Sequence, residues 1–230
     1  MTTGNEPMLH QPPNDNSPMI GRRGAQIIVN ARGAYLAGNL DGLIQVMSDE
    51  QQRRFRMAIV ELALHFARIL VAEYEGNCES LTSCIADAED WLRDGDGQLS
   101  YTALDRLLDS GAIRPIPEEM GAILDSRGHF LGFRNDATYD VRGATHGYFP
   151  TNDISKVAMR IALTMQMDEL HQMLANFAPW WAIHHILTAR GFAFTESVDL
   201  SLNCTKPWQL AAAWAILQGH EPPPFPELPT

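Results

Sequence analysis

The stretch "SDEQQRRFRMAIVELALHFARILVAEYEG", residues 48–76, decides the fold class. Ser48 stands three residues before Gln51, which is the spacing of a capping box at the start of a helix. Apolar residues then recur at intervals of three and four, so they share one helix face; they are Phe55, Ile59, Leu62, Phe66, Leu70 and Tyr74. Gly76 is expected to end the helix. We therefore predict a long amphipathic helix that packs against a core.

Further helices are expected on both sides of this stretch. Before it, residues 25–47 look helical but contain three glycines, which predicts a broken or kinked helix pair. After it, the apolar spacing predicts a helix over residues 81–92 and a short one from Ser100 to Gly111. A long helix should follow from residues 151–153 to Phe177. We place the last two helices from Pro179 to Gly191 and from Pro207 to Gly219.

Two segments favour a small β component. Residues 192–202, "FAFTESVDLSL", alternate between apolar and polar side chains, and this pattern predicts a strand. Residues 118–133 fit a hairpin turning at 125–128, but they also fit a short helix that begins after Pro117, and the hairpin is slightly favoured. The expected fold class is mainly α: an α-helical bundle with a small β patch and a single globular core.

The chain divides into three parts by composition. Residues 1–24 are polar and contain prolines, which indicates a flexible N-terminal arm and not a signal peptide. Residues 25–219 carry the helical pattern of the globular domain. Residues 220–230, "HEPPPFPELPT", form a proline-rich tail that cannot be helical and could lie extended against the body or a partner.

The net charge restricts the partners. At −11 it argues against nucleic acid and against anionic membranes, both of which require clustered Lys and Arg. No run of apolar residues is long enough to span a bilayer. Three cysteines, an odd number without zinc spacing, indicate free thiols in a reducing compartment. We expect a cytoplasmic, acidic protein of prokaryotic type whose protein partner has a basic surface, and a homodimer is left open.

An acidic turn resembles the second half of an EF-hand calcium loop. Asp94, Asp96, Gly97 and Leu99 match the third, fifth, sixth and eighth loop positions, where alternate carboxylates aim oxygens inward. Leu92 and Ala103 stand where the first and last ligands belong, and neither offers a side-chain oxygen. The alternative, which we prefer, is a turn between two helices, since Asp and Gly favour turns.

Histidines paired with carboxylates suggest a metal site inside a helical bundle. Glu61 and His65 are four residues apart, and Asp168 and His171 are three apart. His184 and His185 are adjacent on a third predicted helix. Ligands of this kind project inward from facing helices in bundle metalloproteins. The alternatives are a surface contact for the first pair and hydrogen-bonded core residues for the last, and we expect neither a metal nor another cofactor.

The segment "YDVRGATHGYF", residues 139–149, carries the spacing Arg-x3-His-x-Tyr at Arg142, His146 and Tyr148. It resembles the signature of the HEPN superfamily, helical nucleic-acid-associated domains that include many metal-independent ribonucleases. The resemblance implies that the histidine moves a proton at the ribose 2′-hydroxyl or the leaving oxygen, and that the arginine stabilises charge on phosphorus. The gap is three residues here against four to six in the family, and Gly143 follows the arginine where Asn is common. The alternative is a polar loop.

Residues 61–97 are similar to helical immunity proteins of bacterial toxin systems, through a helix, an acidic turn and a second helix ending in Trp91, Leu92 and Arg93. Such inhibitors gain association rate from an acidic surface. Our preferred hypothesis is a non-catalytic helical interaction or regulatory protein, such as an inhibitor or immunity component of a prokaryotic conflict system, with the adjacent Trp180 and Trp181 as anchors. The alternatives are a HEPN-like ribonuclease using Arg142 and His146, and a helical-bundle metalloprotein.

Overall fold

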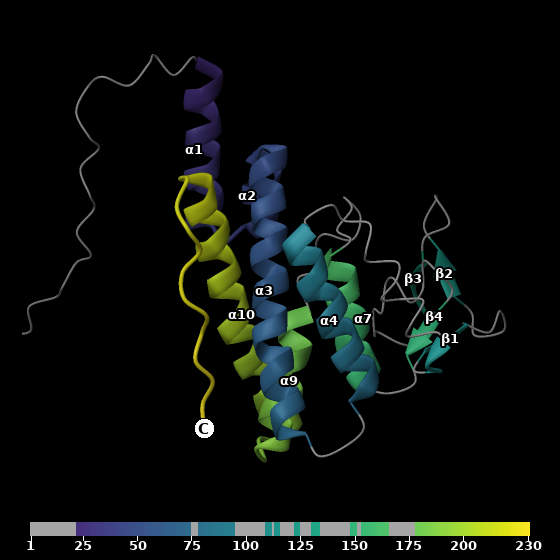
Figure 1. Ribbon diagram of the computed structural model, residues 1–230. Coiled ribbons are helices and arrows are strands. Elements are labelled where there is room, and N and C mark those ends of the chain that lie inside the picture. Colours follow the sequence, from purple (N-terminus) through teal and green to yellow (C-terminus); the bar gives the residue numbers. More distant parts are fainter. Residues whose placement is uncertain are drawn as a thin grey trace, which may run out of the picture.

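The described part of the chain is mainly α-helical (Figure 1). The computed structural model describes residues 22–74, 78–94, 109–111, 113–115, 122–124, 130–133, 148–150, 153–165 and 178–230. The helices are α1 (Arg22–Leu36), α2 (Leu40–Val46), α3 (Asp49–Glu73), α4 (Glu79–Asp94), α7 (Asp153–Met165), α9 (Ala178–Ala189) and α10 (Phe194–Leu217). Helix α3 packs against α4, α7, α9 and α10, so it is the centre of the bundle.

The central helix is the one that the capping box predicts. The Ser48 hydroxyl accepts the backbone N–H of Gln51 at 3.3 Å, and the Gln51 side chain accepts the backbone N–H of Ser48 at 2.9 Å. The predicted inward face is buried from Phe55 to Leu70. Tyr74 differs, because it lies beyond the last turn as the C-cap and is exposed. The predicted end at Gly76 lies outside the described residues.

The expected break in the first helix pair is confirmed at Gly38. This glycine has a φ of 66°, a left-handed conformation that residues with a side chain adopt at a cost. Asn39 then caps α2 by accepting the backbone N–H of Gly42 at 2.9 Å. The ring of Tyr35, near the end of α1, stacks on Trp214 of α10 at 4.9 Å. These contacts hold the C-terminal half of α1 against the bundle.

The strand predicted at residues 192–202 is wrong, because residues 194–202 form the first turns of α10. Ser197, Ser201 and Thr205 follow at intervals of four, and all three are buried on one face of the helix. Their hydroxyl groups donate to carbonyls of the preceding turn; Thr205 Oγ1, for example, lies 2.9 Å from the Ser201 oxygen. The helix itself therefore satisfies the buried hydroxyls, which a strand would not do. In this segment the four-residue spacing of the buried hydroxyls fits the observed helix, and the apolar alternation does not.

The predicted helix start at Pro207 is wrong for the same reason. Pro207 lies inside α10 and is exposed to solvent. Proline has no N–H, so the carbonyl of Asn203 lacks its usual helical donor there. The solvent side is where a helix tolerates such a loss best, because water can hydrate the carbonyl. The predicted end is confirmed, since Gly219 has a φ of 79° just beyond the last turn.

Helices α4 and α9 match their predicted positions, and α7 begins at Asp153 within the predicted range. Gly191, with a φ of 94°, follows α9 as expected. The remainder of the long helix predicted to Phe177 lies outside the described residues, as does most of the short one between Ser100 and Gly111.

Four short strands pair into two separate antiparallel ladders. β1 (Ile113–Pro115) pairs with β4 (Tyr148–Pro150), and β2 (Ala122–Leu124) pairs with β3 (Phe130–Phe133). The second ladder is antiparallel, and the predicted hairpin turn at residues 125–128 lies outside the described residues. β4 leads into α7 and contacts it.

The buried apolar side chains of the described helices form one cluster. Its largest fully buried members include Phe55 and Phe66 of α3, Leu81 of α4 and Met159 of α7. All seven described helices contribute to this cluster, so they share a single core. No helix among the described residues combines the length and the apolar character that crossing a membrane requires.

Candidate functional site

The predicted ribonuclease residues lie mostly outside the described part of the chain. Arg142 and His146 both lie outside the described residues. Tyr148 is the first residue of β4, where its backbone is in register with Pro115 of β1. The convergence of Arg142 and His146 therefore stays a prediction.

The predicted metal ligands are only partly within the described chain. Asp94 ends α4, and the rest of the acidic turn lies outside the described residues, as do Asp168 and His171. Among the side chains that the structure describes, no group of three His, Cys, Asp or Glu is arranged to hold a metal ion. His65 instead packs against the C-terminal tail.

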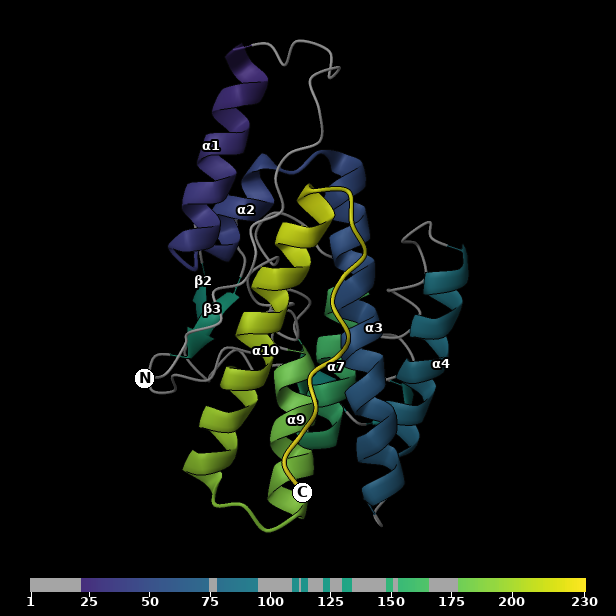
Figure 2. The same ribbon diagram turned by 90° about the vertical axis from the view of Figure 1, so that its left-hand side faces the viewer.

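The C-terminal tail, residues 220–230, is the most extensive candidate site. After α10 the chain reverses direction at Gly219, and the His220 N–H donates to the Ala215 carbonyl at 2.9 Å. The tail then runs back along α10 and α3 in an extended form (Figures 1 and 2). We call the side chains that hold it, Arg54 and His65 of α3, Arg190 and Trp208, the tail-binding surface.

Arg54 holds the beginning of the tail. Its Nη2 donates to the His220 carbonyl at 3.2 Å and lies 3.0 Å from Glu221 Oε1. Glu221 is largely exposed, so this ion pair is screened and contributes at most about 1 kcal/mol. Gln51 adds a hydrogen bond from Nε2 to the Leu217 carbonyl at 3.3 Å. The point at which the tail leaves α10 is thus fixed from α3.

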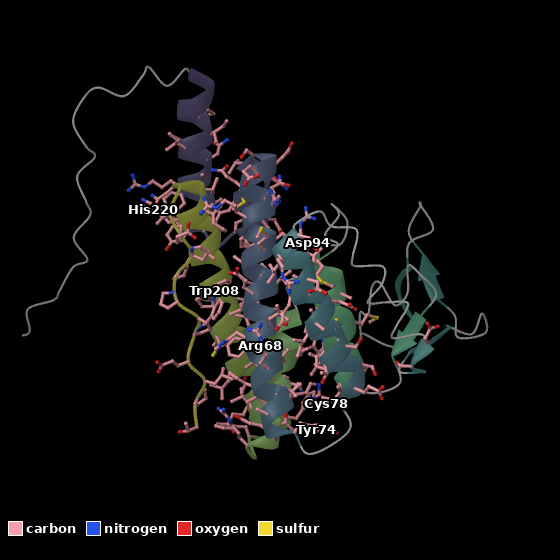
Figure 3. The ribbon with its side chains drawn as sticks, in the orientation of Figure 1. Arg68, Tyr74, Cys78, Asp94, Trp208 and His220 are labelled. Carbon is pink, nitrogen blue, oxygen red and sulfur yellow. The ribbon has the colours of Figure 1, made fainter. Side chains whose placement is uncertain are left out.

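Trp208 of α10 recognises the middle of the tail (Figure 3). Its buried indole Nε1 donates to the carbonyls of Pro223 and Pro224, at 3.1 and 3.0 Å. The Phe225 ring lies 5.7 Å from the Trp208 ring and 4.9 Å from the His65 ring, measured between centroids. Extended proline-rich segments have no internal hydrogen bonds, so their carbonyls and side chains are open to recognition of this kind.

Arg190 holds the end of the tail and joins it to α3. Its Nη1 donates to the Pro229 carbonyl at 2.8 Å. Its Nε and Nη2 donate to the two carboxylate oxygens of Glu73, at 3.0 and 2.6 Å. This hydrogen-bonded guanidinium lowers the pKa of Glu73. The planar fork of arginine makes both contacts at once, which a lysine could not do.

The middle of the tail-binding surface disfavours charge. Burial lowers the pKa of His65, and Arg68 adds to the effect. Burial also raises the pKa of Glu61, and the carboxylate of Glu221 adds to that. In both cases the balance moves toward the neutral form relative to the free side chain. The surface has a charged contact at each end, through Arg54 and Arg190, and aromatic rings in its middle.

The histidine pair of α9 belongs to an aromatic cluster. His184 is buried, and its Nδ1 lies 2.9 Å from the Ser197 hydroxyl. Its ring stacks on Trp180 at 5.6 Å, while His185 stacks on Trp181 at 5.8 Å. His184 is thus a hydrogen-bonded core residue, as one sequence alternative had it. The two tryptophans are half-buried, and each stacks on a histidine four residues further along α9.

A half-open pocket of about 620 Å³ lies against α10. It is lined by residues 38–41, by Trp180 and by the part of α10 around Pro207. The lining is mostly apolar, with Lys206 and Asp41 among its polar members. A volume of this size accommodates a small apolar molecule.

The chain matches no family model, no curated protein and no solved structure.

Sequence reasoning did not identify the residues that bind the tail. The composition of the tail was a usable signal, because five prolines around one phenylalanine leave carbonyls that need donors from elsewhere. Arg54, Arg190 and Trp208 carry no local motif, and they meet only because α3, α9 and α10 pack together.

Proposed function

We propose that the protein is a non-catalytic helical interaction protein that acts by binding extended, proline-rich polypeptide segments. The tail-binding surface is its recognition site. The class of ligand is a segment with prolines on both sides of an aromatic residue, as in the tail itself. The proposal includes a regulatory or inhibitory role of the kind expected from the sequence.

One observation carries this proposal: the surface already holds such a segment. Trp208 supplies a donor to two successive proline carbonyls, and Phe225 packs between Trp208 and His65. Aromatic side chains with an N–H donor are the usual means by which proteins recognise proline-rich ligands. Because proline restricts the free chain, the ligand loses little conformational entropy on binding.

The cellular setting belongs to the same proposal. All three cysteines are free thiols, which supports a reducing compartment such as the cytoplasm. The net charge of −11 supports a partner with a basic surface around its proline-rich segment, because opposite charge speeds association. A toxin of a prokaryotic conflict system would satisfy both conditions.

The experiment is a binding titration with the peptide HEPPPFPELPT, labelled with a fluorophore and followed by anisotropy. In the wild-type chain the tail competes from the same molecule, where its effective concentration is on the order of millimolar. Phe225→Ala weakens this competitor: the Phe225 side chain is 36% exposed, so its partial burial is worth about 1–2 kcal/mol. We expect the variant to bind the peptide about 5- to 30-fold more tightly than the wild type.

Two controls make the titration specific. The peptide HEPPPAPELPT keeps every proline and lacks the aromatic, so it should bind the same variant more weakly. Adding Trp208→Phe to Phe225→Ala removes the indole donor but keeps an aromatic ring, and peptide binding should fall again. If neither the wild type nor Phe225→Ala binds HEPPPFPELPT at millimolar concentration, the surface supports its own tail only and the proposed function is wrong.

A further inference from the structure

The exposure of the tail side chains follows a three-residue period. Every third side chain from residue 221 onward is exposed; these are Glu221, Pro224, Glu227 and Thr230. The residues between them are half-buried with one exception; the half-buried ones are Pro222, Pro223, Pro226, Leu228 and Pro229. The exception is Phe225, which is 36% exposed and whose ring contacts those of His65 and Trp208. The tail therefore has one outward edge and two inward edges.

A period of three identifies the arrangement of the side chains. A polyproline II helix has three residues per turn, whereas a β-strand alternates with a period of two. The five prolines of the tail favour the former, because each fixes φ near the polyproline II value. Successive members of the exposed series thus lie one turn apart, on the side of the tail that faces away from the bundle.

The hydrogen bonds to the tail fit the same period. Trp208 Nε1 donates to the Pro223 carbonyl at 3.1 Å, and Arg190 Nη1 donates to the Pro229 carbonyl at 2.8 Å. Pro223 and Pro229 are separated by two turns of a polyproline II helix, so their carbonyls lie on the same side of the tail. The donors of the tail-binding surface therefore meet equivalent positions of a repeating ligand.

The sequence of the tail has the repeat that this geometry requires. Residues 222–224, 225–227 and 228–230 each begin with an apolar residue, continue with proline and end with an exposed side chain. We call this unit the apolar–Pro–x triplet. Its first position supplies Phe225 and Leu228, and Leu228 packs against the core cluster of the bundle. Its second position supplies the carbonyls of Pro223 and Pro229.

The length of the surface corresponds to three triplets. From Arg54 to Glu73, the residues of α3 at the two ends of the tail contacts, the helix rises about 28 Å at about 1.5 Å per residue. From His220 to Pro229 a polyproline II chain also rises about 28 Å, at about 3.1 Å per residue. Figures 1 and 2 show the tail following α3 along most of its length. A ligand with three consecutive turns therefore reaches both ends.

Charge on the outward edge contributes little to this recognition. The Glu221 carboxylate lies 3.0 Å from Arg54 Nη2, but its side chain is 88% exposed. It also faces Glu61, whose pKa is raised by burial and further by the nearby Glu221 carboxylate. Attraction and repulsion thus act on the same group, and solvent screens both. The outward residues have little influence on which segment binds.

We propose that the partner of the tail-binding surface carries a polyproline II segment of three consecutive apolar–Pro–x triplets. An aromatic residue opens the central triplet, and the third residue of each triplet is free to vary. This inference rests on the proposed function, which it narrows from proline-rich segments in general to one repeat with one phase. The tail is the copy of this ligand that the chain itself contains.

The test compares three labelled peptides of identical composition on the full-length Phe225→Ala chain, by anisotropy. They are HEPPPFPELPT, HEPPPFPLEPT and HEPPPFPTLPE. The second exchanges the residues at 227 and 228, which moves leucine to the outward edge and a carboxylate to an inward one; it should bind about 5- to 10-fold more weakly. The third exchanges the residues at 227 and 230, which both face outward, and should bind within about twofold of the first.

The same two exchanges within the full-length chain test the phase of the tail without any added peptide. Glu227→Leu combined with Leu228→Glu should lower Tm by about 2–4 °C, because an apolar contact is lost and a charge faces the bundle. Glu227→Thr combined with Thr230→Glu is the matched control and should leave Tm within about 1 °C of the wild type. Thermal unfolding followed by circular dichroism measures both.

The outcomes separate this inference from the proposed function. Equal affinity of the three peptides would overturn the triplet repeat, while their binding would leave the proposed function standing. Equal Tm values for the two exchanged chains would also overturn the repeat, since residues 227 and 228 would then not differ in the edge they occupy. If none of the three peptides binds at millimolar concentration, the proposed function is wrong and the partner class falls with it.

Discussion

Arg190→Ala should release the end of the tail and destabilise the fold measurably. Arg190 makes two hydrogen bonds to Glu73 and one to the Pro229 carbonyl. The Arg190 and Glu73 side chains are 24% and 32% exposed, so solvent screens the pair and it contributes about 1 kcal/mol. The hydrogen bond to Pro229 adds about 1 kcal/mol. The free energy of unfolding should fall by about 2 kcal/mol, which lowers Tm by about 4–8 °C for a chain of this size.

The contact between Arg190 and Glu73 makes the stability loss in Arg190→Ala depend on pH. The hydrogen bond from Arg190 holds the pKa of Glu73 below its ordinary value of 4.5. A carboxylate whose pKa is lower in the folded state stabilises that state above the unfolded pKa, and the contribution is lost as the pH falls through the folded pKa. The difference between wild type and Arg190→Ala should therefore be full at neutral pH and shrink below about pH 4.5.

Urea unfolding followed by circular dichroism, at neutral pH and in an acid series, measures both quantities. Arg190→Lys is the matched control, because it keeps the charge but cannot hold Glu73 and Pro229 together. Its free energy of unfolding should fall about half as far as that of the alanine variant. A neutral-pH stability equal to that of the wild type would refute the reasoning. So would a difference that stays constant into acid, since Glu73 would then have no part in it.

Two further predictions concern the bundle itself. Ser48→Ala removes one half of the capping box of α3, so the free energy of unfolding should fall by about 1 kcal/mol. Ser48→Gly should lower the free energy of unfolding by less. The thiol of Cys84 is buried, donates to the Ala158 carbonyl and has a pKa raised by burial, whereas Cys78 and Cys204 are half-buried. An aromatic disulfide reagent at neutral pH should therefore modify Cys78 and Cys204 first and reach Cys84 only at the rate of unfolding; rapid modification of all three thiols would contradict the packing of α4 on α7.

Local signals predicted the helices that carry them. The capping box at Ser48 and the three- and four-residue spacing from Phe55 onward are short-range features, and both were confirmed in α3. Gly219 marked the end of α10 correctly, and one of the three glycines between residues 25 and 47, Gly38, breaks the first helix pair, because a positive φ is a local requirement that glycine meets most easily. Where the physical cause lies within a few residues, the sequence was sufficient.

The beginning of α10 shows why the rest could not be predicted. Its apolar alternation is compatible with a strand, and Pro207 resembles a helix start. The segment is helical because it packs against α9, which buries Ser197 beside His184 and leaves Pro207 on the solvent side. Such long-range burial overrides local propensity and leaves little trace in the residues themselves.

The candidate site depends on long-range contacts even more. The tail was predicted to be extended, since proline excludes a helix, but its binding surface combines Arg54, Trp208 and Arg190 from distant parts of the chain. No spacing rule connects these residues. The motif that indicates catalysis, Arg142 with His146, lies outside the described residues and stays a prediction.

The indole N–H resonance of Trp208 tests the central claim most directly. We predict that, in the full-length Phe225→Ala chain, this resonance moves toward its wild-type position as unlabelled HEPPPFPELPT is added, because the peptide restores the hydrogen bonds to two proline carbonyls. The other tryptophan indole resonances should not follow the same titration. A Trp208 resonance that stays unchanged at millimolar peptide would contradict the claim that this surface recognises proline-rich segments.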